Sequence, residues 1–148
     1  MDRLLLLVVV AAAAGTLAHL VQRRRPDAPV RTGWSVPEQL DRRDFDRPDA
    51  PWLVAVFTSA KCETCSSVVE VAGPLESKAV AFHEVEAGAR KDLHDRYAIE
   101  AVPMVLLVDA VGVVRSHHLG PVSATHLWGS LAELRQPGSI PDGCSAGD

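Results

Sequence analysis

The chain has 148 residues, of which 47 % are hydrophobic, and its formal net charge is −4. This length allows one folded domain with a short appendage and excludes two full domains. The small acidic excess excludes the clustered basic surface of a nucleic-acid-binding protein, so no nucleic-acid partner is expected.

Residues 4–21 form an apolar segment without a charged residue, in which Thr16 and His19 are the clearly polar side chains. About 18–20 helical residues cross the hydrocarbon core of a bilayer, so the segment predicts a single transmembrane anchor in the cell membrane. A cleaved signal peptide is the alternative, because the small residues 11–15 would suit a signal peptidase. The apolar run continues past them to the arginines at 23–25, which favours a retained anchor.

Residues 22–33 are rich in Arg, Pro, Asp and Gly, a composition that predicts a semi-extended linker. The folded domain is expected over residues 34–135, beginning with a charged stretch whose buried anchors are Leu40 and Phe45. Residues 136–148 are rich in Gly, Ser, Pro and Asp and predict a disordered tail.

The first strand is expected at Trp52–Thr58, because this short run is apolar on successive residues, as in a strand buried on both faces. A helix-compatible stretch follows and ends at Gly73-Pro74. Cys62 and Cys65 lie where this helix begins, and two cysteines at this spacing indicate redox chemistry. With Cys62 in the first helical turn and Cys65 one turn on, the sulfurs can reach bonding distance. The helix dipole would then favour the Cys62 thiolate, the species that attacks disulfides.

Three other interpretations of the cysteine pair are weaker. Zinc needs four ligands, and after Cys65 the chain offers only Cys144 and scattered histidines, among them His83, His117 and His118. Covalent haem needs a histidine directly after the second cysteine, where this chain has Ser66. A purely structural disulfide across so short a loop gains little chain entropy. We therefore expect neither a metal nor an organic cofactor.

The remaining elements alternate between strands and helices. A strand is expected at residues 79–86, a helix at 89–97, and an antiparallel hairpin from 105–108 and 113–116. Ser123 can cap a final helix with an apolar face of Leu127, Trp128, Leu131 and Leu134. This order predicts an α/β fold with a mixed central sheet flanked by helices.

From residue 34 to about 134, these features resemble the thioredoxin superfamily. The resemblance rests on the cysteine pair after the first strand, the segment Tyr97–Met104 with its Val102-Pro103 pair, the hairpin, and the last helix. It implies a thioredoxin-like fold in which Cys62 attacks and Cys65 resolves. It further implies that Pro103 is cis and lies opposite the cysteines, and that the backbone of Val102 binds an extended substrate peptide. We assign Lys61 to substrate binding with these two residues.

The sequence also departs from this superfamily near the cysteines. Val56 stands where many thioredoxins have a buried aspartate that helps move the proton of the resolving cysteine. Lys61 stands in place of tryptophan, and Glu63-Thr64 in place of Gly-Pro. Lys61 should favour the Cys62 thiolate and Glu63 should oppose it, so the sequence leaves the reduction potential open.

These features predict a monomeric, membrane-anchored thiol–disulfide oxidoreductase that acts mainly as a reductase of protein disulfides. Its electrons would come from a reductase or a membrane redox partner. One alternative is a non-catalytic thioredoxin-like binding module, which the missing aspartate would explain. Another is an outward-facing oxidoreductase that serves exported proteins.

The charges that flank the apolar segment bear on its orientation. Arg3 and the amino terminus precede it, with Asp2, whereas three arginines follow it directly. Under the positive-inside rule, the side with three arginines stays in the cytoplasm. The folded domain is therefore expected on the cytoplasmic side of the membrane.

Overall fold

The computed structural model describes residues 33–139 of the chain. Within these residues, no helix is long and apolar enough to cross a membrane. The anchor predicted at residues 4–21 lies outside the described residues, as do most of the linker and the tail from residue 140, and all three stay predictions.

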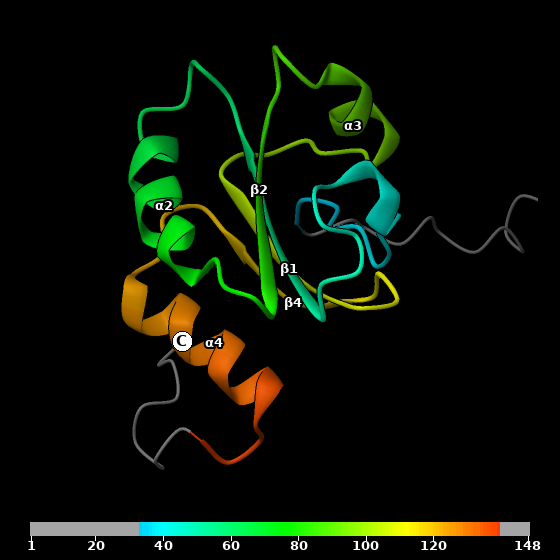
Figure 1. Cartoon of the computed structure of the whole chain (residues 1–148). Coiled ribbons are helices and arrows are strands. Elements are labelled where there is room, and N and C mark those ends of the chain that lie inside the picture. Colours follow the sequence, from blue (N-terminus) through cyan, green and yellow to red (C-terminus); the bar gives the residue numbers. More distant parts are fainter. Residues whose placement is uncertain (1–32, 140–148) are drawn as a thin grey trace, which may run out of the picture. The chain divides into compact units, whose positions relative to one another are not determined.

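The centre of the fold is a mixed sheet of four strands, in the order β2-β1-β3-β4 (Figure 1). The strands are β1 (Trp52–Thr58), β2 (Val80–Glu86), β3 (Met104–Asp109) and β4 (Val114–Leu119). β1 pairs in parallel with β2 and antiparallel with β3, which pairs antiparallel with β4. The two inner strands are the most continuously apolar, because both of their faces are covered. The expected mixed sheet is thus confirmed.

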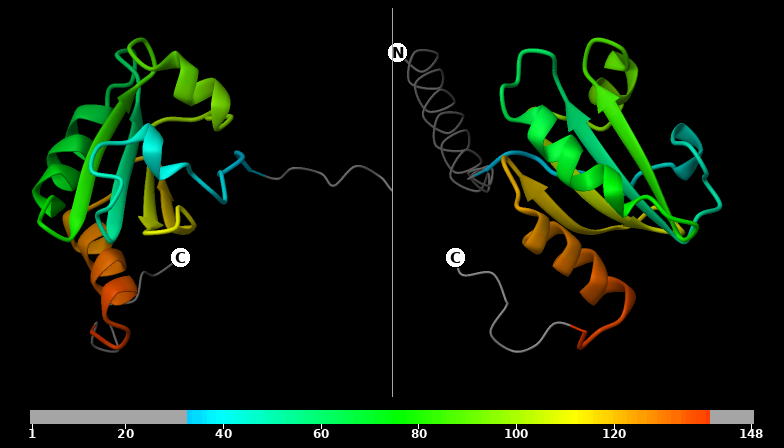
Figure 2. Two further views of the ribbon diagram at one scale, coloured as in Figure 1. Left: turned by 45° about the vertical axis from the view of Figure 1, so that its right-hand side comes forward. Right: turned by 60° about the vertical axis from the view of Figure 1, so that its left-hand side comes forward.

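Helices cover both faces of this sheet (Figure 2). α2 (Cys65–Ala72) and α4 (Ala124–Arg135) lie on one face, and α3 (Lys91–Arg96) lies on the other with the short 3-10 helix η1 (Arg42–Asp44). Since successive side chains of a strand point to opposite faces, β1 contributes to two cores. Val54 and Val56 pack with α2 and α4, while Leu53, Ala55 and Phe57 pack with α3 and the buried anchors Leu40 and Phe45.

Two helix boundaries that were predicted from single residues are confirmed, namely the end of α2 and the start of α4. α2 ends at Ala72, and Gly73–Leu75 continue as one 3-10 turn (η2). Ser123 caps α4, since its side chain accepts a hydrogen bond from the backbone N–H of His126 at 3.3 Å.

The apolar face predicted for α4 needs one correction, at Trp128. Leu127 and Leu131 are buried, but 44 % of Trp128 is exposed. Its indole N–H donates to the carbonyl oxygen of Val71 at 2.9 Å, so Trp128 connects the edge of α4 to the end of α2. An indole needs a partner for its N–H, and the fully apolar face offers none.

Four other elements differ from their predicted bounds. β2 begins at residue 80 rather than 79, β3 covers 104–109 rather than 105–108, and β4 covers 114–119 rather than 113–116. A bulge lies between Leu107 and Val108. α3 begins at Lys91 rather than at residue 89. The reason is that the carboxylate of Glu86 accepts hydrogen bonds from the N–H groups of Gly88 and Ala89, which holds these residues in a loop.

Candidate active site

The two cysteines lie where β1 leads into α2. A loop of residues 59–64 connects the strand to the helix, and Cys65 is the first helical residue. Cys62 lies in a turn before the helix, in which the N–H of Cys65 donates to the carbonyl oxygen of Cys62 at 3.4 Å. The prediction that Cys62 belongs to the first helical turn is therefore wrong. The hydrogen bond between Cys65 and Cys62 forms a separate turn, which precedes the helical hydrogen bonds of α2.

Cys62 and Cys65 form a disulfide bond, with their Cα atoms 5.5 Å apart. The predicted bonding reach of the pair is thus confirmed. Cys65 is only 4 % exposed, whereas Cys62 is partly exposed and its Sγ lies 3.8 Å from the hydroxyl of Thr64. An incoming disulfide can therefore approach Cys62 more readily than Cys65, which fits the expected roles of attacking and resolving cysteine.

A hollow of about 330 Å³ opens beside the disulfide. It is lined by Thr58, Ser59, Ala60, Cys62, Cys65, Ser66, Glu84 and Glu86. β1 and β2 run in parallel, so their carboxyl ends lie at the same edge of the sheet as the cysteine loop (Figure 2, right). Glu84 and Glu86 are two residues apart in β2, so they point to one face of the sheet. Val80 and Phe82 point to the same face, which α2 covers. The site thus contains two carboxylates that no motif in the sequence predicts.

Glu86 fixes the loop that precedes Cys62. Its carboxylate accepts hydrogen bonds from the N–H groups of Ala60 at 3.0 Å, Gly88 at 2.8 Å and Ala89 at 2.9 Å. These three donors lower the pKa of Glu86, because they stabilise its charged form. Glu86 therefore connects the cysteine loop to the loop between β2 and α3.

Glu84 is bound from the neighbouring strand. The hydroxyl of Thr58, which is buried, donates to Oε1 of Glu84 at 2.8 Å. Within residues 33–139, Oε2 of Glu84 accepts no hydrogen bond. One carboxylate oxygen of Glu84 is thus oriented by the protein, and the other is free to interact in the hollow.

The residues predicted to bind substrate lie near this edge but do not line the hollow. The Val102–Pro103 peptide bond is cis, as the resemblance implied. Met104 pairs with Phe57, so Pro103 lies at the end of the sheet where β1 leads into the cysteine loop. The side chain of Val102 packs against the core, and Lys61 is exposed. Their contacts with a substrate stay predictions.

One sequence signal could have located the missed residues. Val80, Phe82, Glu84 and Glu86 occupy every second position of one strand, which places them on one face of the sheet. Two carboxylates therefore end a row that begins with two apolar residues. The sequence does not show that Thr58 lies beside them, because that contact depends on the register of β1 against β2.

The histidines that were considered as metal ligands do not form a metal site. Among the described residues, no group of three or more His, Cys, Asp or Glu side chains is arranged to hold a metal ion. His83 pairs with Asp46 at 3.1 Å. The ring of His118 is partly buried, and this burial, with His117 and His126 nearby, lowers its pKa. Cys144 lies outside the described residues.

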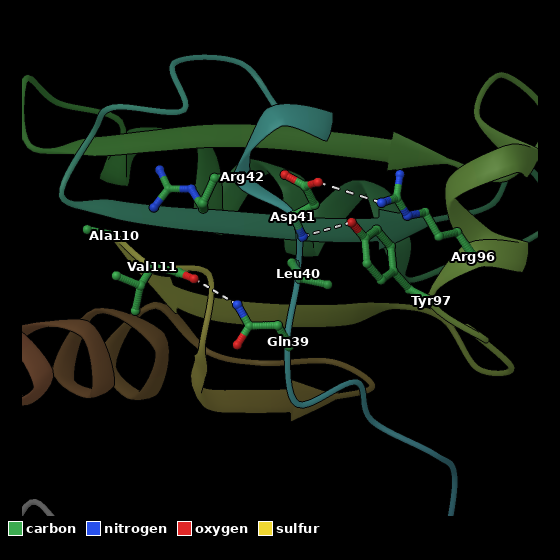
Figure 3. Close-up of a pocket in the computed structure, with 8 residues that line it drawn as sticks. All are labelled: Gln39, Leu40, Asp41, Arg42, Arg96, Tyr97, Ala110 and Val111. Carbon is green, nitrogen blue, oxygen red and sulfur yellow. Dashed lines mark hydrogen bonds and ion pairs between the residues drawn. The ribbon is translucent and has the colours of Figure 1, made fainter.

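A larger hollow of about 510 Å³ lies over the opposite face of the sheet and is lined by residues of η1, α3 and the β3–β4 turn (Figure 3). Most of its polar groups bind one another. The hydroxyl of Tyr97 accepts from the N–H of Asp41 at 3.0 Å and donates to Asp44. Burial and the hydrogen bond to Asp44 raise the pKa of Tyr97 to about 12. These contacts hold the segment before β1 against α3, and we assign them a structural role.

Comparison with known proteins gives likenesses of structure only. No protein-family model and no curated protein matches the chain. A thioredoxin variant from Halobacterium salinarum NRC-1 superposes with a TM-score of 0.54 and 18 % identity, over 68 % of this chain and 95 % of that one. A structure described as a malarial protein superposes with a TM-score of 0.51 and 15 % identity, over 56 % of this chain and 96 % of that one. The chain therefore has a thioredoxin-like fold, with the Cys62–Cys65 pair at the start of α2.

Proposed function

We propose that this protein is a membrane-anchored thiol–disulfide oxidoreductase that reduces protein disulfides through Cys62 and Cys65. The observation that carries the proposal is the disulfide between two unequally exposed cysteines at the edge of a thioredoxin-like sheet. A disulfide that closes so short a loop adds little to stability by chain entropy, so its exchange chemistry is the better reason for its presence.

The reaction begins with the reduced protein. The thiolate of Cys62 attacks one sulfur of a substrate disulfide, forms a mixed disulfide and releases the other substrate sulfur as a thiolate. Cys65 then loses its proton and attacks Sγ of Cys62, which releases the second substrate thiolate. The substrate gains two electrons, and Cys62 and Cys65 lose two as their disulfide forms.

Each turnover leaves an oxidised pair that needs a donor of two electrons. We assign this role to a reductase or a membrane redox partner that reaches the partly exposed Cys62. Neither a metal nor an organic cofactor takes part in this scheme, because both half-reactions are thiol exchanges.

The competing proposal is a non-catalytic binding module. Val56 is fully buried among apolar side chains, so no carboxylate occupies that position. A module of this kind would bind partner peptides near Pro103 without exchanging disulfides.

Turnover separates the two proposals. The full-length protein is incubated with insulin as the disulfide substrate and dithiothreitol as the donor, and the rate of insulin reduction is measured above the uncatalysed rate. We expect turnover by the native protein, loss of turnover in Cys62→Ser and Cys65→Ser, and no change in Cys144→Ser. Absence of turnover in the native protein would favour the binding module, and a large loss in Cys144→Ser would assign that thiol to the reaction.

A further inference from the structure

Resolution of the mixed disulfide requires Cys65 to lose a proton in a poor environment for a thiolate. A free thiol has a pKa of about 8.5, and burial in apolar surroundings opposes ionisation further. Cys65 is almost fully buried, and it belongs to α2, which covers the face of the sheet that carries Val56. A base beside Cys65 would therefore speed this step.

Two carboxylates line the hollow next to Cys65, and their hydrogen bonding distinguishes them. Glu86 already accepts three hydrogen bonds from backbone N–H groups, which oppose its protonation. Glu84 accepts one, on Oε1, from Thr58. Its Oε2 keeps unused acceptor capacity among the described residues.

The register of the sheet brings Glu84 to the cysteines. Glu84 lies opposite Val56 in the parallel pairing of β1 with β2, and both residues point to the face that α2 covers. Thr58 follows Val56 by two residues on the same face, and its hydroxyl bridges the two strands. The edge strand thus supplies a carboxylate beside a position of the inner strand that has none.

We propose that Glu84, oriented by Thr58, accepts the proton of Cys65 across this hollow during resolution. This inference rests on the proposed function. The S–H bond of Cys65 breaks as the proton moves to the Glu84 carboxylate, directly or through a water molecule in the hollow. The thiolate then forms the bond to Sγ of Cys62 and expels the substrate thiolate, and Glu84 later returns the proton to solvent. No electron passes through Glu84.

Among the residues that the structure describes, few ionisable side chains share the hollow with Glu84. The other ionisable side chains that line the hollow are Cys62, Cys65 and Glu86. His94 of α3 interacts electrostatically with Glu86, which is the weakest of the effects that lower the pKa of Glu86. Lys61 and Glu63 carry opposite charges in the exposed part of the cysteine loop. Substitution of Glu84 alone therefore shows how much of the pH dependence of resolution comes from this carboxylate rather than from the other groups.

The test measures attack and resolution as separate events. The reduced full-length protein carrying Cys144→Ser is mixed with one equivalent of 5,5′-dithiobis(2-nitrobenzoate), and release of thionitrobenzoate is followed by stopped-flow absorbance. The first release reports attack by Cys62, and the second reports displacement by Cys65. Near neutral pH, Glu84→Gln should slow the second release about 100-fold, the lower end of general-base contributions, and leave the first within about twofold. The deficit should shrink as the pH rises above the ordinary thiol pKa of about 8.5, where solvent removes the proton.

Matched variants separate a proton-transfer role from a structural one. Glu84→Asp should restore part of the second rate, and Thr58→Val should slow this step less than Glu84→Gln does. Glu70→Gln removes an exposed carboxylate from α2 and should change neither release. An unchanged second release in Glu84→Gln, or an equal slowing of both releases at every pH, would overturn the role of Glu84. A native protein that releases only one thionitrobenzoate would instead refute the proposed function, and the role of Glu84 with it.

Discussion

Cys62 and Cys65 differ in exposure because the helix begins between them. The buried residues of α2 are Cys65, Val68 and Ala72, which follow one another at spacings of three and four along its inner face. Cys62 also has a three-residue spacing from Cys65, but it precedes the helix and is only partly covered. The same three-residue separation that lets the sulfurs bond therefore leaves one of them accessible and the other covered.

This difference predicts which variant traps a substrate. In Cys65→Ser, mixed disulfides on Cys62 should accumulate, because the resolving thiol is gone. Cys62→Ser should trap none, since Cys65 is almost fully buried. Non-reducing gel electrophoresis after acid quenching, with each variant expressed in cells, measures the adducts. Equal trapping by the two variants would contradict the assigned roles.

Glu86 predicts a pH dependence of stability. Three backbone donors lower its pKa below the ordinary value of 4.5, so its stabilising effect is complete above that value. The effect is lost as the pH falls through the lowered pKa of the folded state. We expect Glu86→Gln to be less stable than the native protein at neutral pH, and the difference to shrink below pH 4.5. Urea unfolding of the oxidised proteins at several pH values measures this.

An exposed glutamate provides the control for Glu86. Glu63 lies in the cysteine loop but is exposed, and Glu63→Gln should preserve the pH dependence of the native protein. If Glu86→Gln instead showed the same change of unfolding free energy with pH as the native protein, the three hydrogen bonds would not contribute as described.

At the scale of elements, the β3–β4 turn connects the segment before β1 to the sheet. Gly112 has a φ of +88°, and its carbonyl oxygen accepts from the N–H of Leu40 at 2.8 Å. A Cβ at this position would lie 2.1 Å from the carbonyl oxygen of Leu40 and 2.7 Å from Nε2 of Gln39, both too close for a real contact. The turn therefore needs glycine both for its left-handed backbone and for this close approach.

Two glycine substitutions separate these effects. Gly120 has a φ of +80°, but a Cβ there would meet nothing within 4 Å. Gly120→Ala should therefore lower the free energy of unfolding only by the cost of a left-handed backbone at a non-glycine residue, about 1–2 kcal/mol. Gly112→Ala should lower the free energy of unfolding by at least about 1 kcal/mol more, because the segment around Leu40 must move. Chemical denaturation of both variants gives the comparison, and equal losses would show that the contact with Leu40 relaxes without penalty.

At the scale of the whole molecule, the orientation of the predicted anchor decides where the cysteines work. With the domain on the cytoplasmic side, the pair would meet a compartment that keeps thiols reduced, which suits a reductase. A membrane-impermeant maleimide, added to intact cells under reducing conditions, should then fail to label Cys62 or Cys144 until the cells are opened. Labelling from outside would instead favour an oxidoreductase that serves exported proteins.

Much of the fold could be predicted because its elements carry local signals. The continuous apolar run predicts β1 at its observed bounds, Gly73-Pro74 marks the end of α2, and Ser123 marks the start of α4. Each of these signals acts within about one helical turn or one strand. The causes are the burial of both strand faces, the missing backbone N–H of Pro74 and the capping hydroxyl of Ser123. The prediction failed at Trp128, where the partner of the indole N–H is the carbonyl oxygen of Val71, 57 positions away in the chain.

The sequence by itself determined the cysteine pair, its place after a buried strand, and the cis proline that the resemblance implied. Only the tertiary structure decided that Cys62 precedes the helix and that Thr58, Glu84 and Glu86 surround the pair. β1 and β2 are joined through α2, and their register fixes which side chains meet at the edge of the sheet. Register depends on the burial of both sheet faces at once, so no local stretch of sequence specifies it.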